Sequence, residues 1–138
     1  MPIIPYIHFS GDCAEAMAFY ADLFGAAPPQ IMRYRDAPEM VEVAEGTDLV
    51  MHSEIHAPGG TIMASDYPPG MAGEPQHGMS IMYGVADAET GRRIFERLAT
   101  EGGGTIMDYG PTFWSSGFGM VKDRFGTHWM IAAPAPAA

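Results

Sequence analysis

The sequence predicts an α+β protein built from two βαβββ modules. The same order of elements, a strand, a helix and three further strands, occurs twice along the chain. An offset of 75 residues aligns the expected helix starts at Asp12 and Asp87, and it also aligns Tyr20 with Phe95 inside the helices. The second copy ends in two apolar segments joined by a tight turn at residues 123–126. Two such units in one short chain favour a paired, curved sheet over a doubly wound one.

Length and composition bound the class of protein. A chain of 138 residues with 47% hydrophobic content is long enough for one domain with a sizeable core. No apolar run approaches the roughly 18 residues of a membrane span, so we expect no membrane partner. Cys13 is the single cysteine and cannot form an intrachain disulfide. Residues 1–5 lack the features of a secretion signal, so we expect a cytoplasmic protein.

The charge of the chain excludes one large class of partner. Seven basic and 17 acidic residues give a net charge of −10, which repels phosphate backbones and anionic lipid surfaces. We therefore expect no nucleic acid as a partner. The sequence also has no Gly-x-Gly-x-x-Gly after a strand and no phosphate loop, so it offers no seat for a nucleotide cofactor.

The first module begins with a strand over residues 3–9 and a helix that starts after Asp12. Asp12 and Glu15 have the spacing of a capping box, in which side chains satisfy the first N–H groups of a helix. Gly25 supplies the stop. The apolar positions recur at intervals of four, three and four residues and predict one buried stripe of Cys13, Met17, Tyr20 and Phe24.

Three strands complete the first module, which we place at residues 1–66. Residues 35–40 are polar and predict an exposed loop, and the turn at residues 58–60 closes a hairpin between the last two strands. Residues 67–77 are interrupted by proline and glycine and predict a linker able to cover a pocket mouth. The expected strands are residues 30–34, 48–56 and 61–65.

The second module is placed at residues 78–133. Glycines at residues 102–104 separate its helix from the next strand, and residues 134–138 are expected to fray. We expect both modules and the linker to form a single domain over residues 1–138. The expected elements are a strand at residues 79–85, a helix at 87–101, a strand at 105–109 and a final hairpin within 112–131.

The densest polar chemistry of the chain lies in the strand segment from His52 to His56. Alternate residues of a strand share a face, so His52, Glu54 and His56 project together. An even-numbered turn pairs even positions with odd ones, which places Met63 and Ser65 on the same face. The sequence therefore predicts one mixed polar face across this hairpin.

Three interpretations of this face stay open. It is an exposed polar surface with a histidine hydrogen-bonded to the carboxylate, or an acid/base and ligand-contact site, or a displaced metal site. His52 and His56 would lie about 13 Å apart at the rise of a strand, too far to bind one ion as a simple pair. A metal ion would therefore need Glu54 together with one of the two histidines.

Other polar and aromatic residues have simpler interpretations. We expect Asp66 to cap a turn and Asp123 to initiate the turn of the last hairpin. Cys13 lies on the buried stripe, which argues against a nucleophile. His77 and His128 are isolated and are expected to be surface or hydrogen-bonded side chains. Four aromatic residues bracket the loop before the last hairpin, where they can close over a ligand or plug the core: Tyr109, Phe113, Trp114 and Phe118.

An ordered set of short segments extends over nearly the whole chain. The segments are Pro5-Tyr6-Ile7, Gly11-Asp12-Cys13-Ala14-Glu15-Ala16, Phe19-Tyr20, Phe24-Gly25, Ile62-Met63-Ala64-Ser65-Asp66, and Phe113-Trp114 with the closing hairpin. This set resembles the PhnB-like branch of the vicinal oxygen chelate superfamily, the glyoxalase and bleomycin-resistance fold. The resemblance implies two βαβββ modules, a U-shaped sheet around a cavity, and a homodimer.

Metal-dependent relatives hold an ion with one side chain from the first strand and one from the last strand of each module. None of the residues at the matching positions is a good ligand for the hard or borderline divalent ions used there. Shifting the alignment by one residue brings in His8 beside Ile62 or Ala64, which does not restore a site. We therefore expect no metal and no cofactor. The matching positions are Pro5, Met63, Ser80 and Met130.

The favoured function is the binding of a small organic ligand in a metal-free cavity lined by methionine and aromatic side chains. Two alternatives stay open. One is a metal-dependent or histidine-dependent enzyme of the lyase or isomerase type, with His52 as general base and Glu54 beside it. The other is a protein that sequesters a toxic or antibiotic cation, which the acidic surface favours. The expected ligand contacts are His52, Glu54, Met63, Ser65, Ser80, Met82, Trp114 and Met130.

Overall fold

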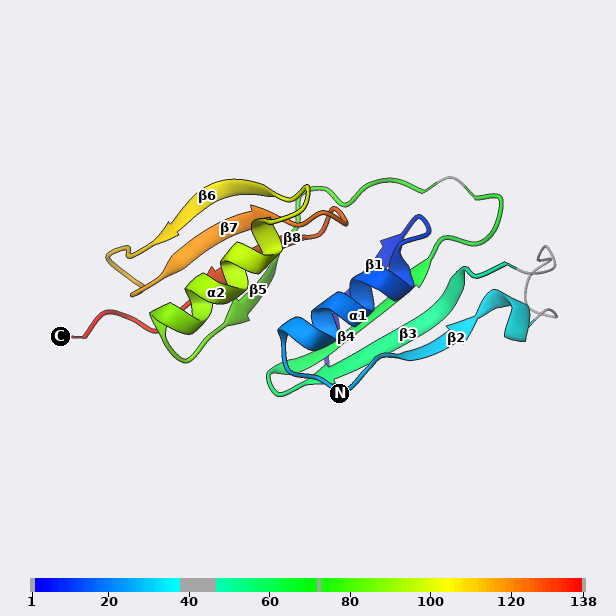
Figure 1. The fold of residues 1–138 in the computed structure, drawn as a ribbon, viewed down its shortest axis with the longest axis horizontal. Coiled ribbons are helices and arrows are strands. Elements are labelled where there is room, and N and C mark those ends of the chain that lie inside the picture. Colours follow the sequence, from blue (N-terminus) through cyan, green and yellow to red (C-terminus); the bar gives the residue numbers. More distant parts are fainter. Residues whose placement is uncertain (1, 38–46, 72, 138) are drawn as a thin grey trace. The chain divides into compact units, whose positions relative to one another are not determined.

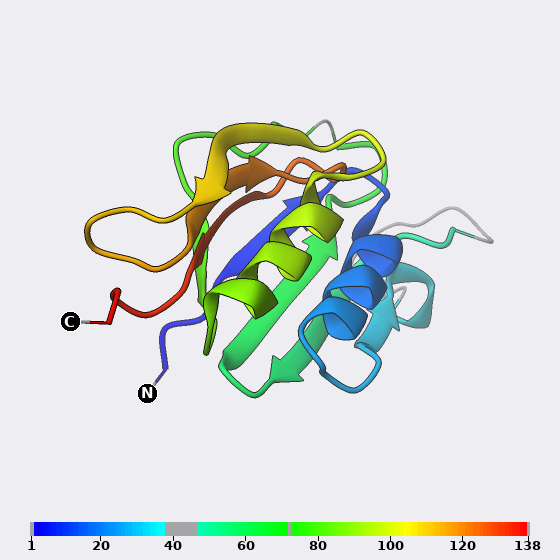
Figure 2. The ribbon, with the colours of Figure 1, turned by 60° about the vertical axis from the view of Figure 1, so that its left-hand side comes forward.

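The computed structural model describes residues 2–37, 47–71 and 73–137. The chain divides into two compact units, Met1–Pro75 and Gln76–Ala138. In each unit one helix lies on one face of a four-stranded mixed sheet (Figure 1 and Figure 2). None of the helices in the described ranges is long and apolar enough to cross a membrane.

The first unit pairs its strands in the order β1-β4-β3-β2, with β1 parallel to β4 and the other pairs antiparallel. The parallel pair is possible because α1 provides the crossover that parallel strands need. The elements are β1 (Tyr6–Phe9), α1 (Cys13–Leu23), β2 (Gln30–Arg33), a 3₁₀ turn η1 (Tyr34–Asp36), β3 (Val50–Ala57) and β4 (Gly60–Asp66).

The second unit repeats this arrangement in the order β5-β8-β7-β6, again with one parallel pair, β5 and β8. The starts of β1 and β5, and of α1 and α2, are each 75 residues apart, which confirms the internal repeat. The elements are β5 (Ile81–Gly84), α2 (Ala88–Ala99), β6 (Gly104–Gly110), β7 (Phe118–Lys122) and β8 (His128–Ala132).

The element boundaries differ from the expected ones mainly at strand ends. The first strand begins at Tyr6 rather than at residue 3, after the proline-containing start. The strand expected at residues 30–34 ends at Arg33 because Tyr34 begins η1. Part of the loop expected at residues 35–40 therefore forms a 3₁₀ turn, and residues 38–40 lie outside the described residues.

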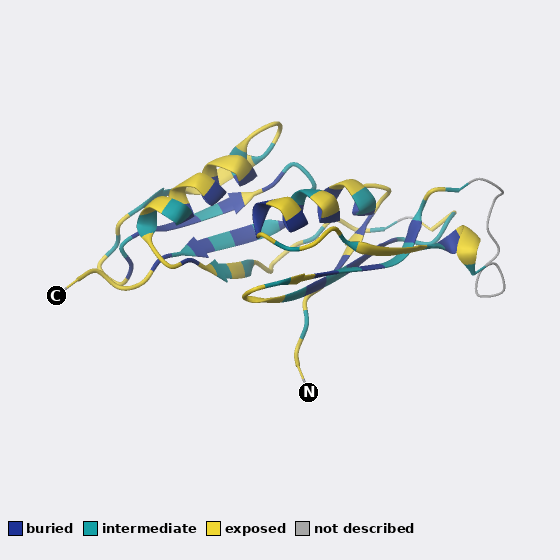
Figure 3. Cartoon of the chain, turned by 60° about the horizontal axis from the view of Figure 1, so that its bottom comes forward, coloured by how far each residue is buried: buried dark blue, intermediate teal, exposed yellow. Residues whose placement is uncertain are grey.

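The buried stripe of α1 is confirmed. Its four predicted residues, from Cys13 to Phe24, are at most 4% exposed, and the helix contacts β3 and β4. Figure 3 shows the buried residues of both helices on the side turned to the sheets. Gly25 adopts a φ of 71° just after the helix, in the left-handed region that glycine tolerates. The stripe and its stop therefore fix one face of the first sheet as a core face.

The N-terminus of α1 is held by Asp66 rather than by the expected capping box. The Asp12 side chain makes no cap hydrogen bond within the described part of the chain. Asp66 is 1% exposed, and its Oδ1 accepts from the backbone N–H groups of Gly11 (2.8 Å) and Cys13 (3.0 Å). Asp66 pairs with Phe9 at the end of β1, so its carboxylate lies where the chain turns into the helix. A negative charge at this position also interacts favourably with the positive end of the helix dipole.

The Asp66 carboxylate also fixes β3, and its main chain fixes η1. Its Oδ2 accepts from the Val50 N–H at 2.8 Å, and its backbone carbonyl accepts from the Tyr34 hydroxyl at 2.8 Å. Asp66 therefore caps a turn, as expected, and it is in addition a buried link between four segments. Burial raises the pKa of Tyr34, so its hydroxyl stays protonated as a donor.

Asp123 closes the last hairpin as expected and also holds a core residue. Its Oδ1 accepts from the N–H groups of Phe125 (2.9 Å) and Thr127 (3.0 Å), which forms the predicted turn. Its Oδ2 accepts from the indole Nε1 of Trp129 at 2.9 Å, and Trp129 is fully buried. The turn and the core of the second unit therefore share one carboxylate.

We predict that Asp66→Asn destabilises the protein by about 2–4 kcal/mol. An amide has one acceptor oxygen instead of two, so the buried Val50 N–H faces an NH₂ group, and the N–H groups of Gly11 and Cys13 lose a charged acceptor. Urea denaturation measures the change. Asp108→Asn is the matched control, since Asp108 is exposed on β6, and it should change the free energy of unfolding by less than about 0.5 kcal/mol. Equal effects of the two substitutions would contradict the role of Asp66.

Candidate functional site

The candidate site lies on the face of the first sheet that points away from α1, which we call the first distal face. Ser53 and Ala64 are fully buried on the helix side, and residues that alternate with them project to the other side. Glu54 pairs with Met63, which also pairs with Tyr6. The residues of the first distal face are Tyr6, His8, His52, Glu54, His56, Thr61, Met63 and Ser65.

The predicted side-chain directions on this hairpin are confirmed. The turn between β3 and β4 has two residues, Pro58 and Gly59, because Ala57 pairs with Gly60. An even-numbered turn keeps residues 52, 54 and 56 on the same face as residues 61, 63 and 65. The pattern of the sequence was sufficient for this result because strand alternation and turn length together fix the register.

Five side chains form a continuous hydrogen-bonded chain on the first distal face, which we call the relay. The Tyr6 hydroxyl lies 2.9 Å from His52 Nδ1, and His52 Nε2 lies 3.1 Å from Glu54 Oε2. On the other side, His56 Nε2 lies 3.0 Å from Glu54 Oε1, and His56 Nδ1 lies 3.0 Å from Thr61 Oγ1. The relay therefore extends across β1, β3 and β4, with Glu54 at its centre.

The protons of the relay have one consistent arrangement. Hydrogen bonds from His52 and then from His56 lower the pKa of Glu54, so its carboxylate is ionised and accepts from both rings. Each histidine then carries its proton on Nε2, which leaves Nδ1 as an acceptor. His52 Nδ1 accepts from Tyr6, and His56 Nδ1 accepts from Thr61. The protons of both hydroxyls and both rings therefore all point along the relay in the direction of Glu54.

A row of rings lies beside the relay. The Tyr67 ring stacks on His8 with centroids 5.4 Å apart, His8 lies 5.2 Å from Tyr6, and Tyr6 lies 5.7 Å from His52. Ser65 Oγ lies 3.3 Å from His8 Nδ1. A π surface next to an ionised carboxylate is suited to a planar or cationic organic group.

Sequence reasoning missed Tyr6, His8, Tyr67 and Thr61 as members of the site. The signal for the first two was the alternation in Tyr6-Ile7-His8-Phe9, in which Ile7 and Phe9 are buried and the polar residues are exposed. The parallel pairing of β1 with β4 places these residues beside the hairpin, and His8 pairs with Ser65.

The positions carried over from metal-dependent relatives do not share one face. Ser80 is two residues before Met82 and so lies on the side of its sheet away from α2. Pro5 is two residues before the buried Ile7 and so lies on the helix side of the first sheet. The repeat of 75 residues preserves where elements begin but not which way their side chains point. No group of three histidine, cysteine, aspartate or glutamate residues in the described ranges is placed to hold a metal ion.

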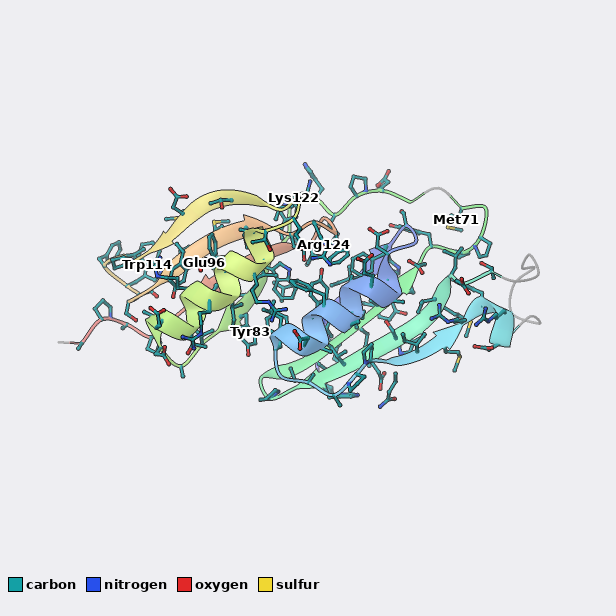
Figure 4. All side chains as sticks on the ribbon, in the orientation of Figure 1. Met71, Tyr83, Glu96, Trp114, Lys122 and Arg124 are labelled. Carbon is teal, nitrogen blue, oxygen red and sulfur yellow. The ribbon has the colours of Figure 1, made fainter. Side chains whose placement is uncertain are left out.

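The remaining predicted contacts belong to the second unit. Of these, Met82 and Met130 lie on the face of its sheet away from α2, which we call the second distal face. Met82 pairs with Met130, and Ser80 lies exposed just before β5. Trp114 is 48% exposed in the loop between β6 and β7, where it packs on the buried Phe118 with ring centroids 5.6 Å apart (Figure 4). The predicted ligand contacts therefore divide between the two units.

Several other candidates have structural roles. Burial raises the pKa of the Cys13 thiol to about 12, and its Sγ lies 3.3 Å from Ser53 Oγ, so it is protonated and enclosed. Tyr109 packs on Phe95 and donates to the Ala88 carbonyl at 2.6 Å, so it plugs the core. His128 departs from expectation, because its Nδ1 is buried with no hydrogen-bond partner in the described structure.

Comparison with known proteins places this chain among close relatives. A family model described as 3-demethylubiquinone-9 3-methyltransferase matches residues 1–132. Protein YjdN from Escherichia coli is 32% identical over 95% of this chain and 94% of its own length.

Two solved structures are similar over almost their whole length. Protein PA1353 from Pseudomonas aeruginosa has a TM-score of 0.88 and 36% identity, covering 99% of both chains. The PhnB protein from Bacillus cereus has a TM-score of 0.73 and 26% identity, covering 96% of this chain and 99% of that chain.

We predict that His52→Ala raises the pKa of Glu54 toward the ordinary carboxyl value, because it removes a hydrogen bond to the ionised form. NMR titration of the ¹³C-labelled carboxyl measures the shift, and His77→Ala, at an exposed position, should leave it unchanged. Because the pKa of Glu54 is lowered in the folded state, the ionised carboxylate stabilises the fold at any pH above the ordinary carboxyl pKa. This stabilisation is lost as the pH falls through the lowered pKa. The stability difference between the wild type and Glu54→Gln should therefore vanish in acid, and a difference that persists there would contradict this account.

Proposed function

The chain belongs to the family described as 3-demethylubiquinone-9 3-methyltransferase, the PhnB-like branch of the vicinal oxygen chelate superfamily, and on that premise we propose that it binds a small organic ligand on the first distal face. The observation that carries the proposal is the relay. Its side chains are already hydrogen-bonded to each other, so they need little reorganisation when a ligand binds.

The direction of the protons selects a class of ligand. Because the relay directs its protons toward Glu54, the groups left for a ligand are oxygen lone pairs of Tyr6, Glu54 and Thr61. Such acceptors bind O–H or N–H donors. The net charge of −10 also disfavours anions. We therefore assign a neutral or cationic ligand with hydrogen-bond donors, whose planar part stacks on the rings of Tyr6 and His8.

The name of the family refers to a methyltransferase, but we do not extend methyl transfer to this chain. The sequence has no glycine-rich segment after a strand to seat a nucleotide-containing methyl donor. The relay consists of groups that hydrogen-bond and exchange protons. These features favour ligand binding and proton transfer over group transfer from a second large substrate.

A proton-transfer enzyme of the lyase or isomerase type is the second candidate, and the order of the relay favours it. Both ring nitrogens of His52 already make hydrogen bonds, so His52 has no free nitrogen for a substrate. The Tyr6 hydroxyl oxygen keeps a free lone pair, so Tyr6 is the group that would contact a substrate. Transfer of the Tyr6 proton to His52 Nδ1 would leave a phenolate, with the imidazolium stabilised by Glu54. The phenolate could then take a proton from an activated C–H group and return it at a second carbon.

Several expectations remain predictions under this proposal. Ser80, Met82, Trp114 and Met130 in the second unit are expected ligand contacts, as are Met63 and Ser65 on the first distal face. The homodimer implied by the resemblance also stays a prediction.

A thermal-shift screen of small amines, alcohols, phenols and carboxylates tests the proposed binding. Donor-bearing neutral or cationic compounds should raise the melting temperature, because binding to the folded state stabilises it by mass action. Glu54→Gln should abolish the shift, whereas Glu96→Gln, exposed on α2, should preserve it. The proposal would be contradicted if only carboxylates bind, or if Glu54→Gln responds like the wild type.

Deuterium exchange in D₂O tests the second candidate with small ketones and aldehydes as activated C–H compounds. The wild type should accelerate the loss of the α-proton signals in NMR spectra. Tyr6→Phe should remove this acceleration and keep the ring row, because only the hydroxyl is lost. His77→Ala is the control. Compounds that bind without any exchange would exclude proton transfer for them and leave binding as the function.

A further inference from the structure

We propose that Met82, Met120, Met130 and His128 on the second distal face form a binding site for a soft monovalent metal ion, with Cu(I) as the fitting species. The proposal does not rest on the relay, since every one of these residues belongs to the second unit. It differs in its donors from the divalent sites of metal-dependent relatives, although Met130 is one of the four positions that match those sites.

The register of the second sheet places methionines side by side on neighbouring strands. Met82 on β5 pairs with Met130 on β8, and Met130 pairs with Met120 on β7. Met107 on β6 also pairs with Met120, between two register shifts of that strand pair, and is not part of the proposed site. Paired strands lie about 4.8 Å apart, so unbranched thioether side chains on three of them can converge on one ion.

The row lies on the side of the sheet away from α2. Val121, Trp129 and Ile131 alternate with the methionines and are fully buried. Gly119, also in that alternation, lies against the Phe95 ring of α2. Met120 and Met130 are partly exposed and Met82 is 64% exposed, so an ion can reach the sulfur atoms from water.

The chemistry of the donors selects the ion. Thioether sulfur is neutral and polarizable, so it binds Zn²⁺, Mn²⁺ and Ca²⁺ poorly but suits Cu(I). The property that excludes the metals of the relatives therefore favours a soft ion. Neutral ligands around a monovalent cation need no charge partner in the sheet, and the acidic chain attracts cations in general.

His128 supplies a fourth donor. It lies two residues before Met130 on β8, on the same face, and pairs with Lys122. Its Nδ1 is buried without a hydrogen-bond partner in the part of the chain that the structure describes. A buried polar atom without a partner is costly, and an imidazole nitrogen is a ligand for copper. Lys122 is exposed, so solvent screens its charge from the site.

Methyl NMR of ¹³Cε-methionine-labelled protein tests the site with Ag⁺ as a redox-inert probe and with Cu(I) under anaerobic reducing conditions. One equivalent should shift the signals of Met82, Met120 and Met130, while those of Met17 and Met71 in the first unit stay in place. The same amount of Zn²⁺ should shift none of the three.

Substitutions identify the donors. Met130→Leu, nearly isosteric, should weaken binding at least about tenfold, as should the exposed Met82→Leu. His128→Gln should weaken binding by a smaller factor. Met71→Leu is the matched control and should bind like the wild type. Cys13→Ser should also bind like the wild type, which excludes the buried thiol as the ligand.

Two results would overturn the site. The first is that the signals of the three methionines do not move at one equivalent of either ion. The second is that binding survives in both Met130→Leu and Met82→Leu but disappears in Cys13→Ser. Thermal melts of each variant establish that it is folded, and the exposed Met82 keeps the test valid if Met130→Leu is destabilised.

Discussion

The first unit depends on the buried carboxylate of Asp66. It accepts from the turn between β1 and α1 and from the start of β3, and its main-chain carbonyl accepts from Tyr34. Together these bonds hold α1 on one face of the sheet and keep β1 aligned beside β4. The relay requires this alignment, because Tyr6 comes from β1 while His52 and Glu54 come from β3. The Asp66 carboxylate, buried on the helix side of the sheet, therefore positions the relay on the first distal face.

The two units share a topology but carry different chemistry on their distal faces. In each, the helix and its sheet form a core from one set of alternating residues, which constrains those residues to be apolar and well packed. The other set is free of that constraint. In the first unit it holds an ionised carboxylate between two histidines, and in the second it holds a row of methionines across three strands. The two copies of an internal repeat can thus keep the same fold while their distal faces carry different side-chain chemistry.

Much of the candidate site could be predicted from local patterns. The alternation in residues 52–56 and the turn at Pro58-Gly59 were enough to place His52, Glu54 and His56 on one face with Met63 and Ser65. What local patterns could not provide was the neighbour across the parallel strand pair, since β1 and β4 are more than 50 residues apart in sequence. Tyr6 and His8 were missed for that reason. The sequence also left open whether His52 is hydrogen-bonded to the carboxylate or acts as a general base, because a sequence cannot show that both of its ring nitrogens are engaged.

The sequence by itself determined the order of elements, the internal repeat, the helix stripe from Cys13 to Phe24 and the turn at Asp123. These depend on spacing between residues close in the chain, where periodicity and turn chemistry act directly. Only the tertiary structure decided that Asp66 rather than Asp12 holds the first helix, that Tyr6 joins His52, and that three methionines meet on neighbouring strands. These are contacts between distant segments, and sheet register, which brings them together, depends on the packing of the whole unit rather than on any local pattern.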